Sequence, residues 1–297
     1  MKKTVPVVLL WVLLACAFTA NAGNNVDTAH QANVELAEKP AKRIVALAPH
    51  LVEIAYAVGV GDKLVAAVSY SDFPEAAKNI PRVGNFATIN VEAIARLQPD
   101  LILAWGSGNP AKSLRKLEDL GFRVYRSEPK SLSDIAKLMN DVARISGHRE
   151  GLSAAKQYQQ KLNKLRQRYQ SQSPVTVFYQ VWNQPLQTLS DQSIVSDVIK
   201  LCGGKNVFGD APAVAPKVSV ETVLRRDPEV IVASGTDASR PKWLDDWKAW
   251  PNLQAVKKDQ LYFVPPDLIQ RHTPRLLQGA EILCKQLAQV RSKQQEI

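Results

Sequence analysis

The sequence predicts an α/β fold with two similar lobes, each built around a parallel central sheet, that are joined by a single long helix. Three observations support this prediction. Segments typical of strands alternate with segments typical of helices, an internal repeat occurs in both halves, and a long helical segment without Gly or Pro separates the halves. Strands that alternate with helices favour parallel sheets made of βαβ units.

The first 22 residues carry the three features of a secretory signal peptide: a basic start, a short apolar run and a small-residue cleavage site at Ala20-Asn21-Ala22. With about 11 residues, the apolar run is too short to cross a bilayer. Lipidation at Cys16 is the alternative, although Cys16 lies within the apolar region and Leu14 is bulky for a lipidation motif. We therefore expect an exported, periplasmic protein whose residues 23–41 form a flexible tail.

Without the signal peptide about 275 residues remain, which is enough for two domains or one large one. The formal charge falls from +10 to +8 because Lys2 and Lys3 are lost. The basic residues are spread along predicted helices, which is typical of a solvated surface. They are not grouped with exposed aromatic side chains as they are in nucleic-acid-binding proteins, so we expect no nucleic-acid partner.

The first lobe is expected over residues 42–146. Its predicted strands cover 43–47, 64–69, 101–104 and 124–125, and its predicted helices cover 53–58, 91–97 and 111–120. Residues 147–173 are expected to connect the lobes. Their central part, 153–169, has apolar side chains on one side and lacks Gly and Pro, which predicts a helix about 25 Å long.

The second lobe is expected over residues 174–297. Its predicted strands cover 175–180, 230–233 and 261–264, and its predicted helices cover 194–202, 220–226 and 274–290. The last helix is expected to begin with Thr273 as N-cap and Pro274 at the first helical position, where a missing N–H costs nothing.

The internal repeat aligns residues 90–106 (NVEAIARLQPDLILAWG) with residues 219–235 (SVETVLRRDPEVIVASG), and seven of the 17 aligned positions are identical. Each copy contains an N-cap residue (Asn90 or Ser219), a short helix with an acidic first turn, a Pro-carboxylate turn and a buried strand that ends in Gly. Two such copies, one in each half, indicate two lobes of similar structure.

Glu92 and Glu221 occupy the second helical position of the two copies. A carboxylate there stabilises the helix N-terminus, and an Arg four residues further on adds a small helical contribution. The alternative role is functional, because one exposed carboxylate per lobe suits docking onto a two-fold symmetric partner. The residues themselves leave both roles open.

Cys202 and Cys284 are the two cysteines that remain after the signal peptide is removed. An oxidising compartment favours a disulfide between them. Cys202 ends one apolar helix and Cys284 lies on the apolar face of the last helix, so the two helices are expected to cross there. Two unbonded core cysteines are the alternative.

Motifs for catalysis and for nucleotide binding are absent or incomplete. Gly106-Ser107-Gly108 lacks the third Gly of a dinucleotide loop, and the sequence contains neither Gly-x-Ser-x-Gly nor His-Glu-x-x-His. His50 and His272 are expected in loops beside the cleft. Two histidines without a short spacing are weak evidence for a metal site, but they remain candidates for axial ligands of a macrocycle. We expect no resident metal and no cofactor.

Aromatic residues at strand ends are the positive signal for a binding site. Tyr70, Phe86 and Trp105 lie in or beside such loops, and the carboxyl ends of parallel strands are where α/β folds bind ligands. Several flat apolar faces suit a large, rigid, ring-shaped ligand. Ordinary core aromatics are the alternative, but the position of Trp105 beside Gly106-Ser107-Gly108 argues against it.

Several segments resemble the siderophore, haem and cobalamin class of periplasmic solute-binding proteins, which serve ABC importers, and most closely the cobalamin-binding members of this class. These segments are Ser69-Tyr70-Ser71-Asp72-Phe73-Pro74, Gln98-Pro99-Asp100-Leu101, Leu103-Ala104-Trp105, Cys202-Gly203-Gly204 and 267–275. The resemblance runs from about residue 43 to residue 290. It implies the class III fold of two Rossmann-like lobes with parallel central sheets, joined by a single long helix, with the ligand clamped between the lobes.

The resemblance also implies which residues contact the ligand. On the first lobe these are Tyr70, Trp105 and Phe86, which stands where the family has Trp, and His50 is added as a cleft-facing replacement of a small polar residue. On the second lobe the implied ligand loop is Asp267, Leu268, Ile269, Gln270 and Arg271. Asp267 and Arg271 would bond to the amide arms or the phosphate of a corrinoid.

By the same resemblance, Glu92 and Glu221 match two carboxylates that engage a membrane permease dimer, and Cys202 with Cys284 matches the family disulfide. The chain departs from the family in its second lobe. Gln187 and Ala215 stand where the family has large aromatics, and Trp182 is a further aromatic without an assigned place.

The sequence therefore predicts a solute-binding protein, monomeric when free, that captures cobalamin or a related corrinoid and delivers it to an ABC transporter permease. Binding of haem or of a ferric siderophore by the same fold is the first alternative. The second is an enzyme that modifies a tetrapyrrole, for which His50 with Asp267 or Asp72 is the candidate titratable pair.

Overall fold

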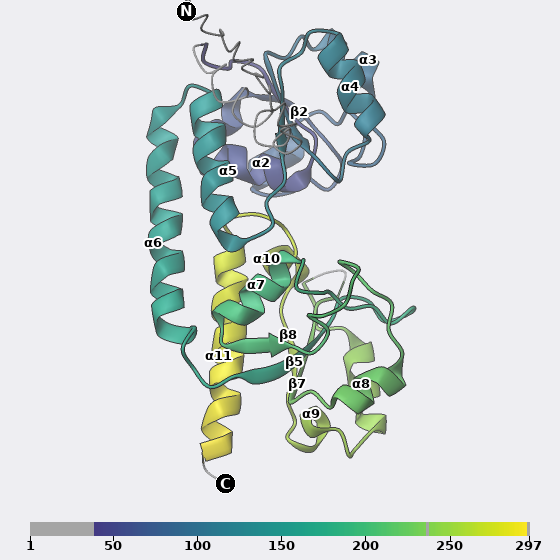
Figure 1. Cartoon of the computed structure of the whole chain (residues 1–297). Helices are drawn as coiled ribbons and strands as arrows, with labels where there is room; N and C mark the ends of the chain where they lie inside the picture. Colours follow the sequence, from purple (N-terminus) through teal and green to yellow (C-terminus); the bar gives the residue numbers. More distant parts are fainter. Residues whose placement is uncertain (1–38, 236–237, 296–297) are drawn as a thin grey trace, which may run out of the picture.

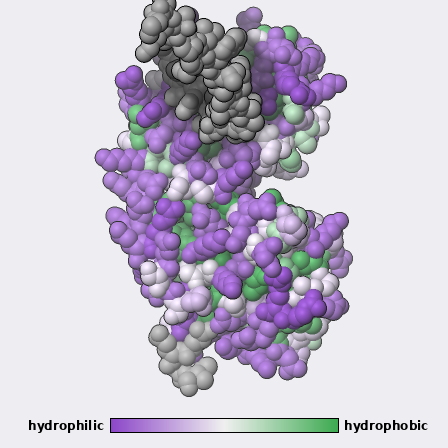
Figure 2. Space-filling view, in the orientation of Figure 1, coloured by the Kyte–Doolittle hydropathy of each residue, from purple (hydrophilic) through white to green (hydrophobic). Residues whose placement is uncertain are grey.

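The computed structural model describes residues 39–235 and 238–295 of the chain. The signal peptide, Cys16 and most of the predicted tail lie outside the described residues. Two lobes are stacked along the long axis of the molecule, and the helix α6 (Leu152–Tyr169) runs along one side (Figure 1). The surface is notched between the lobes on the side away from α6 (Figure 2). Within the described residues, no helix has the length and the apolar composition needed to cross a membrane.

The N-lobe contains a sheet of four parallel strands in the order β2-β1-β3-β4. Its strands are β1 (Ile44–Ala46), β2 (Leu64–Ala67), β3 (Leu101–Trp105) and β4 (Val124–Ser127), and its helices are α2 (Pro49–Ala57), α3 (Val91–Arg96), α4 (Ala111–Asp119) and α5 (Leu132–Ile145). Successive side chains of a strand point to opposite faces, so Ile44 enters one apolar cluster and Val45 enters another. Both faces of the sheet are therefore covered, as is usual for parallel sheets.

The C-lobe repeats this architecture with a parallel sheet in the order β6-β5-β7-β8. Its strands are β5 (Val175–Gln180), β6 (Gly204–Asn206), β7 (Val230–Ala233) and β8 (Leu261–Phe263), and its helices are α7 (Ile194–Leu201), α8 (Val220–Arg226), α9 (Gln254–Lys257), α10 (Pro266–Ile269) and α11 (Leu276–Gln295). The two parallel sheets, covered by helices, confirm the predicted fold class.

The connection between the lobes is packed rather than free. Along α6, Tyr158 and Leu162 are buried, and the Tyr158 hydroxyl donates to the Leu132 carbonyl at 3.0 Å. The Leu132 N–H in turn donates to Asp197 of α7 at 2.8 Å. One apolar cluster contains residues of both lobes, such as Ile44 and Val177. The lobes therefore share a core along the α6 side.

The two copies of the internal repeat occupy equivalent places, since β3 and β7 are each third in their sheet order. The aligned residues Gln98 and Asp227, which lie just after α3 and α8, both have a positive φ, of 47° and 41°. Asp100 then accepts hydrogen bonds from the Lys42 and Arg43 N–H groups. Its counterpart in the second copy, Glu229, accepts one from the Thr176 N–H. In both lobes the repeat thus fastens the start of the neighbouring strand.

Several boundaries differ from the sequence prediction. Helix α2 begins at Pro49 instead of residue 53, and α11 begins at Leu276 because residues 273–275 form a turn in which the Thr273 hydroxyl accepts from the Arg275 N–H. The helices α5, α9 and α10 and the strand β6 were not predicted. Ala41, expected at the end of a flexible tail, is buried, and its N–H donates to Ser146.

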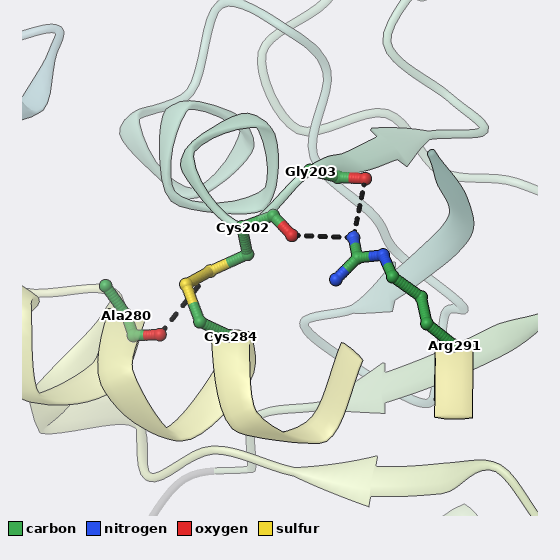
Figure 3. The surroundings of a disulfide bond; sticks show 5 residues. All are labelled: Cys202, Gly203, Ala280, Cys284 and Arg291. Atoms are coloured by element: carbon green, nitrogen blue, oxygen red, sulfur yellow. Dashed lines mark hydrogen bonds between the residues drawn. A yellow bond between two sulfur atoms is a disulfide. The ribbon is translucent and has the colours of Figure 1, made fainter. Parts of the chain in front are cut away.

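The predicted disulfide between Cys202 and Cys284 is present (Figure 3). It joins the C-terminal end of α7 to the middle of α11, and both cysteines are fully buried. About two turns later on α11, Arg291 donates to the carbonyls of Cys202 and Gly203 at 2.8 and 3.0 Å. The bond and the guanidinium together fix α11 against the end of α7.

Replacing both cysteines by alanine should lower the free energy of unfolding by about 4 kcal/mol, because the bond closes a loop over a separation of 82 residues. Urea denaturation of the wild-type protein and of the Cys202→Ala/Cys284→Ala variant measures this difference. A reductant should destabilise the wild-type protein by the same amount and leave the variant unchanged. Equal stability of the wild-type protein and the variant without reductant would show that the disulfide does not constrain the unfolded chain.

Candidate ligand-binding cleft

A cleft of about 910 Å³ lies between the lobes. It is lined by residues of both lobes: Trp105, Gly106, Ser107, Glu128, Pro129 and Lys130 from the first, and Asp191, Gln192, Ser193, Ile194, Val214 and His272 from the second. Most of the N-lobe residues follow or end β3 and β4, so the cleft is at the carboxyl ends of these strands. This is the edge where ligands are expected in open α/β sheets. A hollow of about 610 Å³ near Tyr169 and Arg291 is smaller and remote from these strand ends.

Of the three predicted N-lobe aromatics, Trp105 lines the cleft and Phe86 lies beside it, whereas Tyr70 is not among the lining residues. Tyr70 and Phe86 are large exposed apolar side chains, with exposed fractions of 72% and 41%. Trp105 is half-buried at the end of β3, and its ring centroid lies 6.2 Å from that of Phe86. Tyr70 has a φ of 65°, a left-handed conformation that is uncommon for a residue other than Gly.

Asn109 organises this aromatic group, and the sequence interpretation missed it. Its side-chain oxygen accepts from the Trp105 N–H at 2.7 Å, while its amide nitrogen donates to the carbonyls of Phe86 and Leu47 at 2.9 Å each. Asn109 is buried. One side chain thereby joins three separate segments of the N-lobe, which fixes the aromatic loops relative to the sheet. The available signal was a polar residue directly after Gly106-Ser107-Gly108.

His50 does not lie in a loop, contrary to the sequence prediction. It is in the first turn of α2 and is 5% exposed, because α2 starts earlier than expected. Its ring lies 5.5 Å from that of Trp105 and 5.7 Å from that of His272, which comes from the other lobe. Its Nε2 atom is buried without a hydrogen-bond partner among the described residues. His50 thus packs edge-on against Trp105 and His272, and it is not among the residues that line the cleft.

Both histidines are neutral at physiological pH. Burial, reinforced by the nearby His272, lowers the pKa of His50 to about 3. Burial also lowers the pKa of His272, although Glu128 opposes that shift. No group of three or more His, Cys, Asp or Glu residues that could hold a metal ion occurs in the part of the chain that the structure describes.

A buried ionic cluster joins the lobes behind the cleft. Glu53 of α2, whose side chain is 2% exposed, accepts hydrogen bonds from Arg275 at 2.6 and 2.8 Å and from Arg271 at 3.2 Å. Arg271 also pairs with Asp72 at 2.8 Å and with Asp267 at 2.9 Å. The two arginines belong to the C-lobe, whereas Glu53 and Asp72 belong to the N-lobe, so every one of these contacts except that with Asp267 crosses between the lobes.

Two further observations describe this cluster. The Arg275 guanidinium stacks over the Phe73 ring at 4.0 Å from the centroid, a cation–π contact that also crosses between the lobes. Partial burial alone would raise the pKa of Asp72, but the hydrogen bond and the charge of Arg271 outweigh it and hold that pKa below its usual value. Asp72 is therefore ionised across the physiological range.

The five residues 267–271 of the implied C-lobe ligand loop lie in different surroundings. The Ile269 side chain is fully buried in the core, so it does not face the cleft, which corrects its prediction as a ligand contact. Gln270 donates to the Tyr179 hydroxyl at 3.3 Å. Asp267 and Arg271 already neutralise each other within the ionic cluster. Leu268 is half-buried on α10.

The two predicted docking carboxylates are both exposed near helix N-termini. Glu92 lies on α3 and Glu221 on α8, and these helices are on the side of their lobes away from α6 (Figure 1). Asn90 and Ser219 cap the two helices through their side chains, as the repeat predicted. Glu92 also pairs with Lys116 at 2.6 Å, a contact that has no counterpart at Glu221 in the described residues.

The pKa values of both glutamates lie below the usual range. For Glu92 the hydrogen bond from Lys116 is the main cause. For Glu221 it is the hydrogen bond from its own backbone N–H. Each glutamate is therefore a fixed negative charge, one on the outer part of each lobe.

The chain is similar to known proteins of one family. Residues 44–268 match the family model described as periplasmic binding protein. The vitamin B12-binding protein of Vibrio cholerae serotype O1 is 44% identical over 250 residues, which cover 84% of this chain and 90% of the relative. That of Yersinia pestis is 41% identical over 256 residues, covering 86% and 89%.

Solved structures give the same relationship. The periplasmic vitamin B12 binding protein BtuF of Vibrio cholerae superimposes with a TM-score of 0.78 at 42% identity, covering 85% of this chain and 98% of that chain. The periplasmic haem-binding protein RhuT from Roseiflexus sp. RS-1 superimposes with a TM-score of 0.73 over 84% and 99% of the two chains, but at 22% identity it supports the fold alone.

Glu53→Gln should destabilise the protein strongly, because it leaves Arg271 and Arg275 without their shared buried carboxylate. Removing one partner of a buried ion pair costs about 3–5 kcal/mol, which chemical denaturation measures directly. Glu92→Gln is the matched control, since its ion pair is exposed and its loss should leave the midpoint unchanged. Equal midpoints for Glu53→Gln and the wild-type protein would show that the cluster does not hold the lobes.

The buried, neutral His50 should make the fold sensitive to acid. Because unfolding raises its pKa from about 3 to the usual 6.5, the unfolded chain binds an extra proton between these values, and stability is lost as pH falls through this window. The slope approaches about 1.4 kcal/mol per pH unit for one such group. Denaturation at pH 7, 6 and 5 should show a shallower slope for His50→Leu than for the wild-type protein, and parallel slopes would contradict this account.

Proposed function

Because the chain belongs to the periplasmic binding protein family, we propose that it captures cobalamin or a related corrinoid between its lobes and delivers it to the permease of an ABC importer. Relatives that cover most of the chain at 40–44% identity are vitamin B12-binding proteins. The signal-peptide features of the first 22 residues agree with a periplasmic protein. The protein acts as a monomer until it meets the permease.

The shape and the lining of the cleft favour a large flat ligand. A volume of about 910 Å³ is near the upper end of the range found for small-molecule sites. Trp105 supplies an apolar ring face to the lining, Phe86 lies beside it, and Tyr70 offers a further exposed ring on the same lobe. Burial of such faces against a rigid ligand costs little ligand entropy, so affinity comes from desolvation in a preformed site.

The charges at the cleft are the observation that favours a corrinoid over haem or a ferric siderophore. Arg271 and Arg275 are neutralised by Glu53, Asp72 and Asp267. Haem carries two carboxylates and ferric siderophores are commonly anionic, so either would require free cations. Lys130 is the one Lys or Arg among the described residues that line the cleft, and the carboxylates Glu128 and Asp191 line it too. A corrinoid periphery of neutral amides suits this balance better.

Binding without catalysis is the favoured activity. The enzyme alternative needs a titratable pair in the cleft, for which His50 with Asp267 or Asp72 was the candidate. His50 Nε2 is buried behind Trp105, and both carboxylates are paired with Arg271. The carboxylates of the candidate pairs are thus already committed to Arg271, and the candidate histidine is buried.

Docking onto the permease is assigned to Glu92 and Glu221. The duplicated cassette gives the two lobes the same local structure, and each copy presents one ionised carboxylate. Two similar carboxylates suit two equivalent basic sites on a dimer with two-fold symmetry. Helix capping by Asn90 and Ser219 holds both in place.

Isothermal calorimetry with cyanocobalamin, cobinamide, haemin and a ferric siderophore tests the proposed ligand. The expected result is one-to-one binding of both corrinoids, with haemin and the siderophore weaker by at least about tenfold, since each would bring unpaired charge to the cleft. Tightest binding of haemin or of the siderophore would overturn the assignment in favour of that ligand.

Ligand binding and permease docking should be separable by mutation. Trp105→Ala should weaken corrinoid binding by at least about tenfold, as is typical of a central aromatic contact. Glu92→Arg combined with Glu221→Arg should abolish corrinoid uptake and leave calorimetric affinity unchanged. Glu150→Arg, an exposed charge reversal beside α6, is the matched control for uptake. Loss of affinity in the double variant, or normal uptake by it, would reject the division of roles.

A further inference from the structure

A short antiparallel ribbon follows the carboxyl end of β5 in the C-lobe. Trp182 is bridged to Gln187, and Gln187 is bridged in turn to Lys217. The Val181 N–H donates to the Gln187 carbonyl at 3.0 Å, and the Gln187 N–H donates to the Trp182 carbonyl at 3.1 Å. The Gln187 side chain adds a bond to the Ala215 carbonyl at 3.1 Å. Three chain segments are therefore held side by side in a defined register.

This register places Trp182, Gln187 and Lys217 on one face of the ribbon. Residues directly opposite each other in an antiparallel pair point to the same side, whereas the next residue along a strand points to the other side. Thr188, which follows Gln187, is fully buried, so its side of the ribbon faces the lobe interior. The side that carries Trp182 and Lys217 is the outer one, and both residues are exposed.

The Trp182 ring is fixed although it is exposed. Its Nε1–H donates to the Gln184 carbonyl at 2.9 Å, which satisfies the polar edge of the indole. The exposed fraction of Trp182 is 45%, so a large part of its apolar surface faces solvent. A flat apolar face held in one orientation is pre-organised for a ligand, because little side-chain freedom is lost on binding.

The ribbon continues the C-lobe wall of the cleft. One of its strands leads to Ser190, whose N–H donates to the carbonyl of Val214 at 2.9 Å, and Val214 lines the cleft. Trp182 also follows the carboxyl end of β5 by two residues, on the edge of the sheet where α/β folds bind ligands. Within the cleft itself, the C-lobe residues of the lining include no Phe, Tyr or Trp in the described chain.

We propose that Trp182 is the aromatic contact that the C-lobe makes with the bound ligand, and that Lys217 beside it binds an anionic group of that ligand. Gln187 and Ala215, where the family resemblance would place large aromatics, leave this face without another ring. Lys217 has no carboxylate within ion-pair distance among the described residues. Lys217 is separated from Trp182 by the segment of Gln187, so the two residues lie two inter-strand distances apart, about 10 Å. One extended ligand can therefore reach both.

This inference rests on the proposed function and identifies the ligand part that each residue recognises. Cobalamin carries a phosphodiester, whereas cobinamide lacks the phosphate and its attached base. A ring face serves either corrinoid, because both have the same macrocycle. A cation at Lys217 serves only the one that has the phosphate.

Calorimetry of Trp182→Ala with cyanocobalamin tests the first part. The expected result is an affinity about tenfold weaker than that of the wild-type protein, with most of the loss restored in Trp182→Phe, which keeps a flat face. Leu120→Ala, at an even more exposed apolar residue just after α4, is the matched control and should bind as the wild-type protein does. Unchanged affinity of Trp182→Ala, with an unchanged midpoint of thermal unfolding, would overturn the assignment of Trp182.

Lys217→Gln tests the second part. It should weaken cyanocobalamin binding several-fold, and more so at low salt, while cobinamide binding stays the same. Equal effects on both corrinoids, or none on either, would overturn the role of Lys217. If the wild-type protein bound neither corrinoid, the proposed function itself would fail. A variant that binds both corrinoids as well as the wild-type protein would instead overturn only the role of the substituted residue.

Discussion

The arrangement of the two lobes depends on the buried ion pairs of Glu53 with Arg271 and Arg275. The Glu53 carboxylate is buried in the N-lobe and neutralised by the two arginines of the C-lobe. Separating the lobes would therefore break the contacts between this carboxylate and the two guanidinium groups. A buried ion pair adds little net stability over an apolar contact, but breaking it by removing one partner is costly. The cluster therefore acts mainly to specify one relative orientation of the lobes. The shared core along α6 and the Arg275–Phe73 contact act in the same direction.

A fixed orientation explains the character of the cleft. Because Arg271 is paired with Asp72 and Asp267, the wall beside it carries little net positive charge. The proposed recognition of the ligand therefore relies mainly on ring faces and neutral hydrogen bonds. Asn109 holds these rings in place through hydrogen bonds with the backbones of Trp105 and Phe86, and His50 packs against the Trp105 ring. Specificity in this proposal arises from shape and from the small number of free cations, with one ion pair proposed between Lys217 and the phosphate of the ligand.

The fold was predictable where the information is local. The duplicated cassette contains its own caps, its turn and its strand, and α8 and β7 have the predicted bounds. Helix α5 carried a readable signal in the Ser131–Asp134 capping box that the interpretation did not use. Strand β6 has only three residues, beginning at Gly204, and such a segment lacks the β-branched or aromatic pattern of a strand.

The site was predictable only in part, because its decisive contacts join distant segments. Arg271 and Glu53 are 218 positions apart, so no spacing rule connects them. For Ile269, the resemblance assigned the whole loop to the ligand without the side-chain direction, which the short helix α10 determines by turning Ile269 into the core. For His50, an error of four residues in the start of α2 was enough to turn a predicted loop residue into a buried one.

The most direct test of this account is the distance between the lobes in solution with and without ligand. Spin labels at Lys112→Cys in α4 and Lys257→Cys in α9, both exposed, report that distance by pulsed electron paramagnetic resonance. The account predicts one narrow distribution that shifts by less than about 2 Å when cyanocobalamin is added, as in pre-organised complexes. A broad distribution in the ligand-free protein that collapses to a shorter distance on binding would contradict it.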